Sequence, residues 1–202
     1  MYRERLTSIS WFMRCLNEHI ARAANAEDKC SGRFWEGRFK SQAILDEAAL
    51  INTMVYIDLN PIRAQIAETP ETSEYTSFAE RIAHRNLAAD VKCAFHGNLI
   101  PFIDGNGIID TAYIPMNLSD YIGLIDWSGR QIRPDKRGSI SDNAPPILAR
   151  LGIEQGNWLQ NSQKLEADFR QVVGPAVAIE KFCKTVGQKW LQGINSCRRC
   201  FG

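Results

Sequence analysis

The sequence predicts a mainly α-helical protein. At least six segments carry the apolar spacing or the capping residues of helices, and only residues 98–114 have strand character. The 202 residues are 45% hydrophobic and 23% charged, which is ordinary for a chain that buries a core. The longest apolar runs fall far short of the ~20 residues that cross a bilayer. We therefore expect no membrane helix and no signal peptide, and the low cysteine density predicts a reducing, cytoplasmic environment.

The first two predicted helices are separated by a polar loop. Apolar residues recur at intervals of three and four from Ile9 to Ala24, which predicts an amphipathic helix ending near Asn25. Residues 25–32 are polar and should form a loop. Asp46 is a suitable N-cap for the next helix. The predicted core-facing residues of that second helix are Leu50, Met54 and Ile57.

A proline and a capping pattern delimit the next two helices. Pro61 disfavours the α conformation at the residue before it, so the second helix should end by Asn60. Pro61 can itself open a short helix, with Asn60 as its cap. Ser77 and Glu80 form a capping box, which predicts a fourth helix that reaches the low nineties.

The second half of the chain should be a helical extension. Asn-Gly and Asp-Gly turns between residues 97 and 115 interrupt the periodicity, so we divide the chain into residues 1–95 and 96–202. Ser119 should cap a short helix, and residues 127–138 form a basic loop. Two more helices should carry the apolar faces Trp158, Leu165, Phe169 and Val172, and Ile179, Phe182, Val186 and Trp190.

Charge and cysteine content exclude several classes of protein. The net charge of +1 gives no overall field toward nucleic acid or an anionic membrane, so any basic surface must be local. Six cysteines in 202 residues are too few for a disulfide scaffold. The motif Cys197-Arg-Arg-Cys200 stands alone, whereas structural zinc needs four ligands. We interpret it as a frayed basic tail, unless Cys183 and a histidine converge on it.

Two adjacent motifs lie between residues 32 and 64. The first is Trp35, Gly37, Arg38, Phe39, Lys40 and Ser41, and the second is the unbroken run YIDLNPIRA from Tyr56 to Ala64. In these motifs the chain resembles the IS200-like and REP-associated tyrosine transposases of the HUH superfamily, over roughly residues 8–85. The resemblance implies the helical C-terminal portion of a transposase whose family has a ferredoxin-like α/β catalytic domain, followed by a helical extension.

The resemblance implies a chemistry of single-stranded DNA. In the family, a tyrosine hydroxyl attacks a phosphodiester and forms a covalent phosphotyrosine, and Tyr56 matches that nucleophile. Two histidines separated by one residue hold Mg²⁺ or Mn²⁺ in such enzymes, and Asn60 matches the place of a further metal ligand. A metal ion is a natural requirement, because a phenol with a pKa of ~10 is a poor nucleophile at neutral pH.

The spacing of polar residues on the second helix agrees with that role for Tyr56. Asn52, Tyr56 and Asn60 are spaced by four, which predicts one polar stripe and a partly accessible tyrosine. The alternative is that Tyr56 packs with its hydroxyl hydrogen-bonded and that Asn60 only caps the Pro61 helix.

The histidine pair that holds the metal in this family is missing from the sequence. His19, His84 and His96 are the histidines of the chain, and no two of them form a His-x-His pair. We therefore expect an N-terminally truncated transposase that cleaves no DNA alone. It would need a missing N-terminal half, or a homodimer, as its partner.

The first motif predicts contact with single-stranded or hairpin DNA. Arg33, Arg38 and Lys40 alternate with Phe34, Trp35 and Phe39, which combines phosphate attraction with base stacking. Arg63 extends this surface if the Pro61 helix continues the preceding one. Alternatively, the aromatic side chains seal the core and the cations are merely solvated. At the level of function, the alternative is a non-catalytic helical interaction module derived from a transposase gene.

Overall fold

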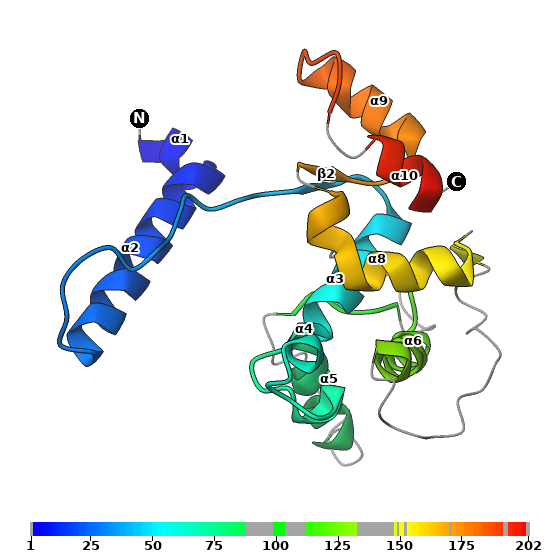
Figure 1. The fold of residues 1–202 in the computed structure, drawn as a ribbon, viewed down its shortest axis with the longest axis horizontal. Helices are drawn as coiled ribbons and strands as arrows, with labels where there is room; N and C mark the ends of the chain where they lie inside the picture. The colour runs from blue at the N-terminus through cyan, green and yellow to red at the C-terminus, as the bar shows by residue number, and fades with distance from the viewer. Residues whose placement is uncertain are drawn as a thin grey trace. The chain divides into compact units, whose positions relative to one another are not determined.

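The computed structural model describes residues 2–87, 99–103, 112–132, 148, 150–151, 153–169, 171–191 and 194–200, and every structural statement below concerns these residues. They are mainly helical, which confirms the predicted class. The chain forms two compact units, residues 1–41 and 42–202, which are described separately (Figure 1). Within the described ranges, no helix is long and apolar enough to span a bilayer.

The first unit consists of two helices followed by a long loop. It contains α1 (Tyr2–Leu6) and α2 (Ile9–Glu27), and α2 follows the predicted apolar stripe. The Trp11 amide donates to the Ser8 hydroxyl at 3.5 Å, so Ser8 caps α2. The loop returns along α2, where Trp35 Nε1 donates to the Asn17 carbonyl at 2.9 Å. No residue of α2 is buried.

The second unit is a helical assembly with a minimal sheet. Its helices are α3 (Glu47–Asp58), α4 (Asn60–Arg63), the 3₁₀ turn η1 (Pro70–Thr72), α5 (Ser77–Leu87), α6 (Leu118–Ile132), α8 (Gln155–Asp168), α9 (Ala176–Thr185) and α10 (Ile194–Cys200). The strands β1 (Ala43–Ile44) and β2 (Val172–Val173) pair in parallel. Phe102 and Ile114 form an isolated bridge inside the region where strand character was predicted.

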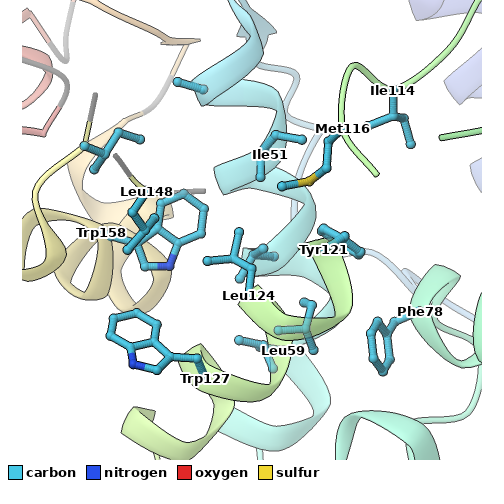
Figure 2. Close-up of a cluster of buried hydrophobic side chains, with 14 of the residues drawn as sticks. Ile51, Leu59, Phe78, Ile114, Met116, Tyr121, Leu124, Trp127, Leu148 and Trp158 are labelled. Atoms are coloured by element: carbon cyan, nitrogen blue, oxygen red, sulfur yellow. The ribbon is translucent and has the colours of Figure 1, made fainter. Parts of the chain in front are cut away.

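Helix α3 lies between two hydrophobic clusters. The first cluster joins α3, α5, α6 and α8 through Ile51, Leu59, Phe78, Tyr121, Leu124, Trp127 and Trp158 (Figure 2). The second joins the end of α8, β2, α9 and α10 and receives Ala49 from α3. Both segments of the predicted division at residue 96 contribute to the first cluster. The core of this unit is therefore built from residues on both sides of that position.

Several local predictions about this unit need correction. The core face of α3 is Ile51, Val55 and Leu59, whereas the predicted face includes Ile57, which is 58% exposed. The reason is that α3 is apolar on nearly every side, so periodicity cannot select a face. Asp46 does cap α3, since its carboxylate accepts the Ala49 amide at 2.8 Å.

The caps of the next two helices also differ from the prediction. Asn60 is the first residue of α4 rather than its cap. Thr76, not Ser77, caps α5, because the Thr76 hydroxyl accepts the Ala79 amide at 3.2 Å while Ser77 binds Asp58. The predicted extension of α5 into the low nineties lies outside the described residues.

Several C-terminal predictions were wrong. Val172, assigned to an apolar helix face, lies in β2. Trp190, assigned to an apolar helix face, lies beyond α9 and is exposed. The tail interpreted as frayed forms α10, and Cys197 is buried in the second cluster.

Candidate functional site

The predicted site residues fall in both units. Arg33, Trp35, Arg38 and Lys40 belong to the first unit, and Tyr56, Asn60 and Arg63 belong to the second. We therefore describe a loop site and a tyrosine site. The first is the segment 33–40, and the second is the last turn of α3 with α4 and the part of α8 that they contact.

The tyrosine site brings its three predicted residues into contact. Tyr56 is partly exposed on the last turn of α3, as its spacing predicts, and Asn60 is exposed. The Arg63 guanidinium carbon lies 3.7 Å from the centroid of the Tyr56 ring. Arg63 Nη2 donates to the Tyr56 carbonyl at 2.8 Å and to Asn60 Oδ1 at 3.1 Å. Arg63 Nη1 donates to the carbonyl of Ser162 on α8.

These contacts hold Arg63 within the second unit. That Arg63 extends the DNA-facing surface of the first motif stays a prediction. Its Nη1 and Nη2 atoms donate three hydrogen bonds to acceptors of its own unit. The guanidinium is thus integrated into the tyrosine site. The Tyr56 carbonyl lies in the last turn of α3, where the helix dipole favours a cation.

Asn52 departs from the predicted polar stripe. It is fully buried, and neither its Oδ1 nor its Nδ2 has a hydrogen-bond partner in the described part of the protein. Asn161 on α8 is likewise fully buried, and its Oδ1 and Nδ2 have no hydrogen-bond partner among the described residues. Both residues lie on helices that pack against each other, α3 and α8. The stripe is therefore split: its first member is enclosed, and only Tyr56 and Asn60 reach solvent.

Asp58 is a structural centre that the sequence analysis missed. This residue of the second motif is buried, and it accepts the Tyr121 hydroxyl at 2.6 Å, the Ser77 hydroxyl at 3.0 Å and the Phe78 amide at 3.3 Å. Burial raises the pKa of Tyr121 well above its usual value of 10.0, and the charge and hydrogen bond of Asp58 raise it further. Asp58 therefore ties α3 to α5 and α6 immediately beside the tyrosine site.

The loop site displays its cations and two of its aromatic rings. Arg33, Arg38 and Lys40 are exposed, and Phe34 and Trp35 are 42% and 39% exposed, with their rings packed edge to face at 4.9 Å. Phe34 and Trp35 therefore do not seal a core, which was the alternative prediction for these aromatic side chains. Arg33 also donates to the carbonyls of Trp35 and Glu36, at 2.8 and 2.6 Å, which stabilises the loop.

A second cation–aromatic group in this unit was not predicted. The guanidinium carbons of Arg5 and Arg14 lie 4.2 and 5.1 Å from the Trp11 ring. In the sequence, Arg14 stands three positions after Trp11, which is one helical turn and could have signalled the contact.

Among the residues that it describes, the structure gives no support for the metal site predicted at Asn60. Among the residues that the structure describes, no three His, Cys, Asp or Glu side chains gather into a site. The predicted convergence of Cys183 and a histidine on the Cys197–Cys200 motif involves His96 and the side chains of His84 and Cys200, which lie outside the described residues. Asn60 Oδ1 faces the positive guanidinium of Arg63, which disfavours a divalent cation at the same oxygen. In this arrangement Asn60 is therefore a poor ligand for Mg²⁺ or Mn²⁺.

Comparison with known proteins gives no relative. No family model, no curated protein and no solved structure matches the chain. The transposase resemblance therefore rests on the two motifs alone.

Proposed function

We propose that this chain binds single-stranded nucleic acid and descends from a tyrosine transposase, with Tyr56 as its latent nucleophile. The observation that carries the binding function is the loop site, where three cations and two aromatic rings are all exposed. Exposed aromatic rings among cations are the usual means of stacking bases while neutralising phosphates. A loop with no such partner would gain by burying these rings.

The proposed reaction requires a second polypeptide. Tyr56 Oη would form a bond to phosphorus while the bond between phosphorus and the leaving oxygen of the strand breaks, and the phenolic proton would pass to that oxygen. The metal that the resemblance implies would have to come with the histidine pair that this sequence lacks. Alone, the chain is proposed to bind without cleaving.

Binding is tested by the fluorescence anisotropy of a labelled oligothymidine over a range of salt concentrations. We expect measurable binding at low salt. The triple variant Arg33→Gln, Arg38→Gln, Lys40→Gln should reduce the log–log salt slope by about 2, since each single-strand phosphate contact contributes ~0.7. The matched control replaces the exposed Lys181, Lys184 and Lys189 of the second unit by Gln and should change nothing. Absence of low-salt binding would refute the proposal.

Catalysis is tested with a single-stranded hairpin and Mn²⁺. The chain alone should form no adduct that survives a denaturing gel. With a polypeptide that carries the family's histidine pair, an adduct should appear and disappear in Tyr56→Phe. The control Tyr75→Phe alters a fully exposed tyrosine and should retain the adduct. An adduct that persists in Tyr56→Phe would show that another residue attacks.

A second candidate function is a non-catalytic interaction module. It is favoured by the exposed apolar residues Ile9, Phe12 and Leu16, which lie on one side of α2. If the anisotropy test is negative, Phe12→Ser should be compared with the unaltered chain for retention of a copurifying protein.

A further inference from the structure

Arg63 makes an unusual set of contacts for a surface cation. Its donors reach Tyr56 on α3, Asn60 on α4 and Ser162 on α8, and its guanidinium also lies over the Tyr56 ring. The two backbone carbonyls among these acceptors cannot rotate away, so they fix the plane of the guanidinium. A planar group with several N–H donors suits such a set of acceptors, whereas a lysine ammonium does not.

We infer that Arg63 is the positioning residue of the tyrosine site and that α8 is the anchor that holds it. This inference rests on the proposed nucleophilic role of Tyr56. The guanidinium covers one face of the ring at 3.7 Å and so restricts the directions in which the hydroxyl can point. It also fixes the Asn60 amide through Oδ1. An ordered nucleophile reacts faster because its orientational entropy is lost before the reaction.

The contact between α8 and Arg63 gives the C-terminal extension a role in the tyrosine site. Ser162 lies about 100 positions after Arg63 in the sequence, within the segment for which the motifs supply no function. The packing of α8 on α3 brings its carbonyl to Arg63. The extension is thus part of the tyrosine site, and the motif from Tyr56 to Ala64 is not sufficient to build that site.

The same contacts give Arg63 a different expected role from that of the residues proposed to bind nucleic acid. A phosphate contact should lower the single-strand salt slope by ~0.7 when it is removed. A positioning residue should leave that slope unchanged while it alters the exposure of Tyr56 and the rate of attack. These expectations differ for one and the same substitution.

The test compares Arg63→Gln and Arg63→Lys with the control Arg130→Gln, whose arginine is bound to Asp126 on the exposed side of α6. Hydroxyl-radical footprinting reads the accessibility of the Tyr56 ring, with the exposed Tyr75 as internal reference. We expect oxidation of Tyr56 to rise about twofold or more in both Arg63 variants. Hydrogen exchange around Ser162 should rise with it. Neither change should occur in Arg130→Gln.

The functional measurement uses the mixture with the histidine-pair polypeptide at saturating DNA. Adduct formation should slow about tenfold or more in Arg63→Gln, and Arg63→Lys should not rescue it, while the salt slope stays unchanged. Unaltered footprinting of Tyr56 in a folded Arg63→Lys protein would overturn the inference, even if Arg63→Gln does not fold. If no adduct forms with unaltered chain, the proposed reaction fails, yet the footprinting still decides whether Arg63 holds Tyr56.

Discussion

The two units divide stability and charge between them. Among the described residues, the buried ones lie in the second unit, from Ala48 onward, while α2 of the first unit buries none. The first unit has eight basic and five acidic residues, a net charge of +3, and the second has 16 basic and 18 acidic residues, a net charge of −2. A core stabilises a fold by removing apolar surface from water. The second unit therefore carries the stability, and the first unit offers the surface suited to a polyanion.

Removing one tryptophan from each unit should affect stability very differently in the two units. Trp158 is fully buried and its Nε1 donates to the Ser128 hydroxyl at 2.9 Å. Trp158→Ala should lower the free energy of unfolding by about 3–5 kcal/mol in urea titrations. Trp35→Ala should cost less than about 1 kcal/mol, because the ring is already partly exposed. Equal losses would contradict the division.

The next largest effect should come from the centre of hydrogen bonds in the second unit. Asp58→Ala removes the acceptor for Tyr121, Ser77 and Phe78, so we expect a loss of about 3 kcal/mol in the free energy of unfolding. Asp126→Ala is the control, since this exposed carboxylate pairs only on the surface with Arg130. It should cost less than about 0.5 kcal/mol. A loss at Asp58 as small as at Asp126 would argue against a structural role.

Tyr121 gives the same region a pH dependence. Its pKa in the folded protein lies above the 10.0 of an exposed tyrosine, so its contribution to stability is intact below pH 10. Above that pH the unfolded chain loses the proton first, and the free energy of unfolding should fall by up to ~1.4 kcal/mol per pH unit. Urea midpoints between pH 8 and 11 should show this fall, and Tyr121→Phe should lessen it. Tyr75→Phe, at an exposed site, should leave it unchanged.

The buried amides of Asn161 and Asn52 should give the smallest change in stability. Asn161→Leu replaces a buried amide without a hydrogen-bond partner in the described residues by an apolar side chain of similar size. The free energy of unfolding should rise by about 1 kcal/mol, and the same holds for Asn52→Leu. Asn195→Leu, on the exposed side of α10, should change it by less than about 0.5 kcal/mol. A decrease at Asn161 would indicate that a bound water satisfies the amide.

Local signals in the sequence predicted local structure. The cap at Asp46 and the break at Pro61 bound α3 and α4 nearly as expected. Tyr56, Asn60 and Arg63 come together because they lie within eight positions on consecutive turns. By contrast, the contact with Ser162 and the hydrogen bond from Tyr121 join distant segments, which no periodicity reveals. The strands β1 and β2 are only two residues long, which is too short to show an alternating pattern. Their pairing joins segments that are far apart in the sequence.

The long interval between α3 and α8 has a consequence for biosynthesis. Almost 100 residues separate the end of α3 from the start of α8, which covers it. At a translation rate of about 5–20 residues per second, that distance takes about 5–20 s. Throughout this time the apolar surface of α3 that faces α8 stays uncovered on the nascent chain. The second unit therefore completes its core only late in synthesis, and until then this uncovered surface is exposed to aggregation.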